Sequence, residues 1–185
     1  MRGLIISGGI RRGARGIPWI VAVGLAAAIP AGAAPSAVTL AREGKAAARI
    51  VLAADATAPE ETAARELCEY LGKATGGTFT LAREVEAPAT DACVYVGPTR
   101  FAKAKGIDCS RLGAEEWVLR AVGKDLILAG GRPRGTLYAI YRFLEDEVGV
   151  HWWNAYEESV PKTPTLSVAA LDRRGKPVIR YRDIY

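Results

Sequence analysis

The residues with the clearest chemical potential form a glycine-rich turn between a strand-like run and a helix-like run. This segment, residues 126–141, reads LILAGGRPRGTLYAIY. Such a turn can cradle a phosphate, because its backbone amides and the positive end of the following helix converge on the anion. Two phosphate-binding motifs have comparable spacing, and each depends on one particular residue.

Both motifs fail at the residue that performs the chemistry. The dinucleotide motif G-x-G-x-x-G needs its middle glycine where Arg132 stands, and an arginine side chain blocks the approach of a pyrophosphate to the backbone. The P-loop motif has its glycines at Gly130 and Gly135, but Thr136 follows directly and the lysine is missing. We therefore expect an architectural turn and no cofactor. A small nucleotide-binding enzyme is the weakest alternative.

The same turn carries two arginines, Arg132 and Arg134. Cations near a helix N-terminus oppose the helix dipole, so each arginine is expected to face an acidic partner, either in this domain or on a domain docked to it. Pro133 is expected in the first helical turn, where proline is tolerated. Gly135 is expected to let the helix pack close to the sheet.

A second candidate region contains two adjacent tryptophans. His151, Trp152 and Trp153 alternate along a predicted strand, so the tryptophans face opposite sides. One is expected in the core, and the other is an interface anchor or a platform on which a sugar stacks. His151 has no serine or cysteine partner in a recognised motif and is expected to be structural. Glu157 and Glu158 are expected in an exposed loop. The alternatives are that they face a sugar or pair with an arginine of another domain.

The cysteines and the single histidine do not form a metal-binding pattern. Cys68, Cys93 and Cys109 are 25 and 16 positions apart, without a C-x-x-C pair. This spacing argues against a zinc site, so no metal is expected. Buried thiols are the favoured interpretation, and one disulfide is the alternative for an exported protein.

The N-terminus has the three-part pattern of a secretory signal peptide. Residues 1–16 carry four arginines and no acid, an apolar run spans residues 17–29, and small residues follow up to an expected cleavage after Ala33. Thirteen apolar residues are short for a membrane span, although an uncleaved anchor remains the alternative. Cleavage removes four arginines and no acid, so the formal net charge falls from +5 to +1. We therefore expect a periplasmic or extracellular protein that does not bind nucleic acid.

Apolar periodicity predicts interleaved helices and strands. The expected elements are two strands around residue 44, a helix beginning at Thr57 and ended by Gly76, a strand over 78–84, a central strand over 93–97, a short helix over 98–105, a hairpin over 116–131, a helix over 133–148 and a strand over 150–154. The hairpin interrupts the alternation, so we predict a single α/β domain with a mixed sheet sandwiched by helices. The expected boundaries are a signal peptide over 1–33, a short tail over 34–37, the α/β domain over 38–176 and a linker over 177–185.

The second half of the chain resembles a known family. The turn Gly-Gly-x-x-Arg-Gly-Thr, the helix Tyr-x-x-Tyr-x-Phe-Leu-Glu and the following Gly-x-x-Trp are similar to the N-terminal α/β domain that precedes the catalytic barrel of bacterial glycoside hydrolases. The α-glucuronidase type is the nearest resemblance, and the β-hexosaminidase N-terminal domain is a more distant one. The resemblance covers roughly residues 38–176 and is most specific over 126–164.

The resemblance implies that this chain holds no catalytic residues, because the catalytic acids of such enzymes lie in the barrel. Residues 175–185, GKPVIRYRDIY, resemble the linker and the first barrel strand. Glu145 and Asp146 lie off the apolar stripe of their helix and are expected to be solvated. The expected function is therefore a non-catalytic accessory domain of an exported carbohydrate-active enzyme, with the barrel of the same protein as its partner. The alternative is a free-standing carbohydrate-binding or envelope interaction module.

Overall fold

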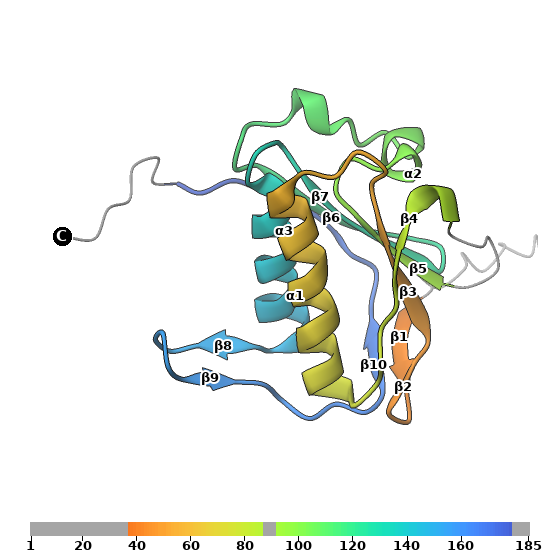
Figure 1. Ribbon diagram of the computed structural model, residues 1–185, viewed down its shortest axis with the longest axis vertical. Helices are drawn as coiled ribbons and strands as arrows, with labels where there is room; N and C mark the ends of the chain where they lie inside the picture. Colours follow the sequence, from red (N-terminus) through yellow and green to blue (C-terminus); the bar gives the residue numbers. More distant parts are fainter. Residues whose placement is uncertain (1–36, 87–91, 179–185) are drawn as a thin grey trace, which may run out of the picture. The chain divides into compact units, whose positions relative to one another are not determined.

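The computed structural model describes residues 37–86 and 92–178 (Figure 1). The predicted signal peptide and most of the predicted tail and linker lie outside these residues. A six-stranded sheet is the centre of the described fold, and its strands run in the order β11-β6-β7-β5-β3-β4. The strands are β3 (Ala48–Leu52), β4 (Leu81–Arg83), β5 (Ala92–Val96), β6 (Trp117–Val122), β7 (Asp125–Gly130) and β11 (Asp172–Gly175).

The sheet is mixed, as predicted. Strands β4, β3, β5 and β7 are parallel, whereas β6 runs antiparallel to both β7 and β11. The β6–β7 pair is the predicted hairpin, closed by Gly123 at a φ of 62°. Strand β5 lies in the middle of the parallel part, as its unbroken apolar sequence indicates.

Helices cover both faces of the sheet. On one face lie α1 (Ala58–Thr75) and α3 (Gly135–Phe143), which continues into the π-helical turn η3 (Leu144–Val148) (Figure 1). The opposite face is covered more thinly by α2 (Arg100–Ala104) and the 3-10 turn η2 (Cys109–Arg111). Among the residues that the structure describes, no helix combines the length and apolar character needed to cross a bilayer.

Strand β7 is apolar throughout because both of its faces are covered. Leu126 and Leu128 belong to the core beneath α1 and α3, whereas Ile127 and Ala129 belong to the smaller core beneath α2. All four side chains are fully buried. Successive strand residues point to opposite faces, so a strand with two covered faces needs apolar residues at every position.

Helix α1 begins and ends where its sequence predicts. Its N-cap is Thr57, whose backbone amide donates to the Glu60 carboxylate at 2.7 Å, as the capping motif requires. The C-cap is Gly76 with a φ of 83°, a left-handed conformation that glycine adopts without a steric cost.

Two small sheets complete the fold. The strands β1 (Val38–Arg42), β2 (Lys45–Ala46) and β10 (Leu166–Val168) form one, in the order β10-β1-β2. The strands β8 (His151–Trp152) and β9 (Glu158–Ser159) form a separate hairpin. Two strands flank the turn at residues 43–44, as expected, but the second is interrupted: β2 ends after two residues, and the chain continues as β3 into the large sheet.

Three other predicted boundaries differ from the structure. The strand expected over 78–84 is only β4, because Glu84 leaves the strand and accepts hydrogen bonds from the backbone amides at the start of α2 at 2.8 Å and 2.9 Å. Helix α2 begins at Arg100 because the Thr99 hydroxyl caps it, accepting from the Ala102 amide at 3.1 Å. Pro133 is not in the first turn of α3, since it lies in the turn that precedes the helix, which begins at Gly135.

Candidate functional site

The glycine-rich turn lies where the parallel strands β3, β5 and β7 end, the edge at which α/β sheets usually bind ligands. Arg132 fills this edge. Its guanidinium donates to both carboxylate oxygens of Glu60, at 3.0 Å and 3.2 Å. It also donates to the side chain and the carbonyl oxygen of Asp55, at 3.2 Å and 2.9 Å. The guanidinium is therefore engaged by two acids of this domain.

Glu60 is the buried member of this pair. It is 1% exposed, whereas the Arg132 side chain is 40% exposed. The hydrogen bond that Arg132 donates to Glu60 is the largest cause that raises the pKa of Arg132. The partner of Arg132 thus lies inside this domain and not on a docked one. Because Glu60 also caps α1, the pair ties the start of that helix to the turn after β7.

The amides of the turn are already used within the chain. Gly131 donates to the Glu116 carbonyl at 2.9 Å, Arg134 to the Ala114 carbonyl at 3.1 Å, and Gly135 to the Gly131 carbonyl at 2.7 Å. A cradle for phosphate needs such amides to point at the ligand. The architectural interpretation of the turn agrees with these bonds.

The three glycines of the turn allow close contact between backbone segments. A Cβ atom at Gly130 would collide with the backbone of Gly135, one at Gly131 with that of Gly113, and one at Gly135 with the Glu116 carbonyl. The expected close packing at Gly135 is confirmed. Its neighbour Arg134 points away from this contact and pairs with Glu115 at 2.8 Å, with its side chain 59% exposed.

The β8–β9 hairpin is fixed to the helices by a cluster that we call the hairpin anchor. Its members are Tyr70, Lys73, Tyr141, Trp152 and Glu158. The Trp152 indole donates to the Tyr70 hydroxyl at 2.8 Å and packs edge-on against the rings of Tyr70 and Tyr141. The Tyr70 hydroxyl donates to one Glu158 oxygen at 2.5 Å, and Lys73 donates to the other at 2.8 Å. Both strands of the hairpin are therefore held by α1.

Glu158 is exposed, as expected, but it lies in a short strand and not in a loop. Glu158 is in β9, and its hydrogen bonds with Lys73 and then with Tyr70 lower the pKa of its carboxyl group. Burial is the largest cause that raises the pKa of Tyr70, followed by its hydrogen bond to Glu158, so the phenol keeps its proton and donates it. Sequence reasoning missed the anchor because its members are separated by as many as 88 positions.

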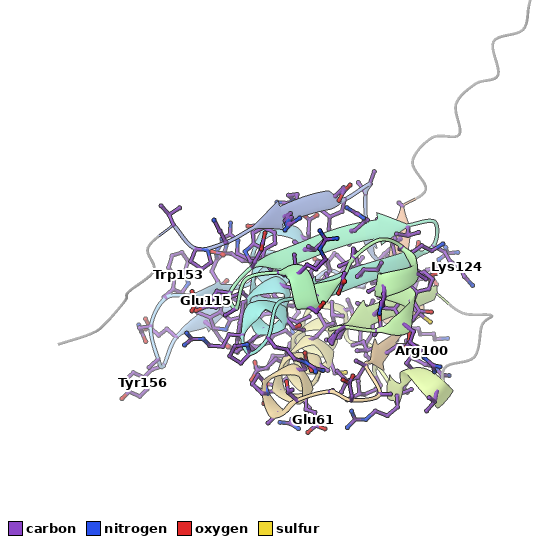
Figure 2. The ribbon with its side chains drawn as sticks, turned by 90° about the horizontal axis from the view of Figure 1, so that it is seen from above. Glu61, Arg100, Glu115, Lys124, Trp153 and Tyr156 are labelled. Atoms are coloured by element: carbon purple, nitrogen blue, oxygen red, sulfur yellow. The ribbon has the colours of Figure 1, made fainter. Side chains whose placement is uncertain are left out.

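The tip of the hairpin presents two aromatic rings to solvent. Trp153 is 69% exposed and Tyr156 is 96% exposed, and Figure 2 shows both at the same end of the domain. The exposed His151 ring stacks on Trp153 with a centroid distance of 5.6 Å. The two tryptophans therefore face opposite environments, as expected, with Trp152 half-buried in the anchor. Tyr156 was not singled out from the sequence.

A polar turn shapes this tip. The Asn154 side-chain oxygen accepts from the backbone amides of Tyr156 and Glu157, at 2.8 Å and 3.1 Å, and its amide nitrogen donates to the Glu157 carboxylate at 2.8 Å. Glu157 is exposed, as expected. An asparagine that bonds to its own turn reduces the conformations open to the loop.

The remaining candidates have structural surroundings. Cys93 and Cys109 are buried free thiols, as expected, whereas Cys68 is only half-buried. Burial raises the pKa of Cys68 and of Cys109 to about 11, so both remain protonated thiols at neutral pH. Within residues 37–86 and 92–178, no group of three or more metal-ligating side chains could hold an ion.

The two acids that are expected to be solvated on the second long helix have different ion-pair partners. Glu145 is exposed and pairs with Arg142 at 2.8 Å. The Asp146 side chain is 23% exposed and pairs with Arg173 of β11 at 3.1 Å. Asp146 is also exposed as a residue, as expected, and its carboxylate additionally connects the helix to the edge strand.

Together these features define a small α/β sandwich domain in which an ion pair lies at the ends of the parallel strands. Residues 35–143 match the family model described as glycosyl hydrolase family 67 N-terminus, and the chain belongs to this family. The expected resemblance to the N-terminal domain of an α-glucuronidase is confirmed.

A solved structure has a similar fold. It is titled a novel family GH115 4-O-methyl-alpha-glucuronidase with specificity for decorated arabinogalactans, and it superposes with a TM-score of 0.54 at 21% sequence identity. The match covers 72% of this chain and 18% of that one, so the chain spans less than a fifth of the larger protein. No curated protein matches the sequence.

Proposed function

We propose that this chain is the non-catalytic N-terminal accessory domain of an exported, α-glucuronidase-like glycoside hydrolase that degrades polysaccharides. Its role is to dock on a catalytic domain of the same protein and to stabilise it. The carrying observation is the anchored β8–β9 hairpin, which holds Trp153 and Tyr156 in solvent at 69% and 96% exposure. The family membership supports the same role.

Exposed aromatic side chains on a shaped turn suit a docking surface. Tryptophan and tyrosine dominate the binding energy of protein interfaces, particularly when they enter pockets on the partner. The hairpin anchor and the Asn154 turn hold the two rings before any partner arrives, which reduces the entropy lost on binding.

The acids near the hairpin do not support catalysis. Hydrolysis of a glycosidic bond uses two carboxyl groups, one of which acts as a general acid with a raised pKa. Glu158 is held by Lys73 and Tyr70, and its pKa is lowered. Glu157 accepts a hydrogen bond from Asn154 within the turn.

The docking role is tested with Trp153→Ala and Tyr156→Ala in the longer protein that carries the catalytic domain. Loss of one interface anchor is expected to lower the melting temperature of the catalytic domain and to weaken capture of that domain by the separate chain at least tenfold. Val85→Ala is the matched control, because Val85 is 66% exposed but lies by the far sheet edge. Equal effects of all three changes would contradict the proposal.

The non-catalytic role and export have separate readouts. The chain over 34–185 is expected not to hydrolyse aryl-glucuronides, and turnover lost in Glu157→Gln would reverse this view. Protein recovered from the host's periplasm or medium is expected to start at Ala34, whereas intact Met1 in the cytoplasm would contradict export.

A free-standing carbohydrate-binding module is the second candidate, because the exposed Trp153 ring could stack on a sugar. Quenching of Trp153 fluorescence by xylan or arabinogalactan oligosaccharides, absent in Trp153→Ala, would favour this alternative. An open reading frame that continues past codon 185 into a domain with paired acids would favour docking.

A further inference from the structure

A pocket of about 360 Å³ lies on the sheet face opposite α1 and α3. Its floor is apolar and includes Ile107 and Val118, which are 5% and 4% exposed. Its walls carry the side chains of Arg111, Arg120 and Arg174. The pocket has the size of ligand sites for molecules as small as a monosaccharide.

The three arginines come from three different elements. Arg111 ends η2, Arg120 is in β6, and Arg174 is in the neighbouring strand β11, directly opposite Val118. Residues 118 and 120 point to the same face of β6, because strand side chains alternate. Sheet pairing and the loop after α2 therefore bring the three guanidinium groups around one cavity.

Existing ion pairs use only part of the donor capacity of these arginines. Arg120 donates from Nε to Asp172 at 2.8 Å and from one terminal nitrogen to the Lys105 carbonyl at 3.4 Å. Arg174 donates from Nε to Glu116 at 2.7 Å. These bonds fasten β11 to the sheet, and a guanidinium has five N–H donors in all, so further donors remain on each side chain.

Arg111 differs from Arg120 and Arg174 in its exposure and its bonding. Its side chain is exposed and forms no hydrogen bond or ion pair with the residues that the structure describes. An arginine with a free planar fork at the mouth of a pocket is suited to binding a carboxylate or a phosphate through two parallel bonds.

Asp108 is the one acid that lines the pocket, and it is already engaged. Its carboxylate accepts from the Ser110 amide at 3.1 Å and from the Ser110 hydroxyl at 2.7 Å. These bonds, together with the charges of Lys103 and Arg111, lower its pKa. The lining of the pocket thus carries three arginines and one acid, and Arg120 and Arg174 are also paired with Asp172 and Glu116 beside it.

We propose that this pocket binds a small oxyanion ligand of about monosaccharide size, with its carboxylate or phosphate group held by Arg111, Arg120 and Arg174 and its body on the Ile107–Val118 floor. This inference does not depend on the proposed docking function, because the pocket and the hairpin are formed by different elements.

The test titrates the full 185-residue chain with sodium glucuronate, inorganic phosphate and glucose, followed by amide NMR shifts and calorimetry. Glucuronate is expected to shift the amides over residues 106–112, to bind more weakly as salt rises, and to bind at least tenfold more tightly than neutral glucose. Binding of phosphate without glucuronate would assign the ligand to the phosphate class. Equal binding of glucose, or no binding of any probe, would overturn the proposal.

Arg111→Gln is the sharpest variant, since its side chain contributes little to the fold. It is expected to weaken glucuronate or phosphate binding at least tenfold while the amide spectrum elsewhere is unchanged. Arg65→Gln is the matched control, because Arg65 is an exposed arginine on α1, outside the pocket. Equal affinities in the wild type, Arg111→Gln and Arg65→Gln would show that the pocket does not hold the anion.

Discussion

The turn after β7 and the β8–β9 hairpin are each joined to α1 by an ion pair, but the two pairs have different structural effects. Arg132 and Glu60 draw the turn inward and close the edge of the sheet. Lys73 and Glu158 hold the hairpin away from the sheet, with its aromatic tip in solvent. The first pair lies at the ends of the parallel strands, whereas the second belongs to the cluster that fixes a hairpin with two exposed aromatic rings.

The two ion pairs differ in how deeply their carboxylates are buried. Glu60 is 1% exposed, whereas the Glu158 side chain is 35% exposed. A buried carboxylate that loses its cation is costly, because nothing else compensates its charge. An exposed pair contributes little, because water screens it. The turn should therefore be part of the cooperative core, and the hairpin should be able to detach while the core stays folded.

The largest expected effect is at Gly135. Gly135→Val places a branched side chain against the Glu116 carbonyl and the Gly130 backbone, neither of which can move freely. Overpacking of this kind is expected to lower the free energy of unfolding by about 3 kcal/mol. Urea unfolding followed by far-UV circular dichroism measures it. Gly113→Ala is the control, since a Cβ there meets atoms only at ordinary distances of 3.8 Å, and equal losses would disprove the close packing.

A smaller effect is expected at Glu60. Glu60→Ala leaves Arg132 with Asp55 alone and removes the acceptor for the Thr57 amide. We expect a loss of about 2 kcal/mol, below the usual cost of breaking a buried pair because Arg132 is 40% exposed and can be hydrated. A double-mutant cycle with Arg132→Ala is expected to give a coupling energy of about 1 kcal/mol. Additive single effects would show that the pair does not close the turn.

The smallest effect concerns pH and the hairpin. The pKa of Glu158 is lowered in the folded protein, first by Lys73 and then by Tyr70, so its contribution is present at neutral pH and is lost as the pH falls through the folded pKa. Amide exchange in β8 and β9 is expected to accelerate, relative to the core, as the pH falls below the ordinary pKa of glutamate, about 4.3.

Two variants isolate this carboxylate from the others that titrate in the same range. In the Glu158→Gln variant, the amide hydrogens of the hairpin are expected to exchange rapidly at every pH. Glu145→Gln removes a comparable exposed pair with Arg142 and is expected to leave hairpin exchange as in the wild type. A hairpin whose protection is independent of pH in the wild type would show that Glu158 does not hold it.

Features that depend on nearby residues could be predicted from the sequence. The ends of α1 follow from Thr57, Glu60 and Gly76, each of which acts on backbone groups a few positions away. The β6–β7 hairpin and the doubly covered strand β5 follow from alternation and from an unbroken apolar run. The architectural role of the glycine turn followed from the residues missing from the phosphate motifs.

Features that depend on distant residues could not be predicted. Arg132 was expected to have an acidic partner, but Glu60 stands 72 positions earlier, and nothing local to either residue connects them. The anchor joins Tyr70 to Glu158, and the arginine pocket joins η2, β6 and β11. Each of these contacts exists only because the sheet order brings separate elements together.

The pairing of β1 with β10 has a consequence for the order in which the domain is made. Val38 lies opposite Val168, so the first strand of the fold can be covered only after about 130 further residues have left the ribosome. Val38, fully buried in the finished domain, lacks its strand partner Val168 during that time. A contact between such distant residues slows folding, because the long loop must close before the contact is gained. The nascent chain therefore carries an open strand edge, and with it a risk of aggregation, until β10 is available.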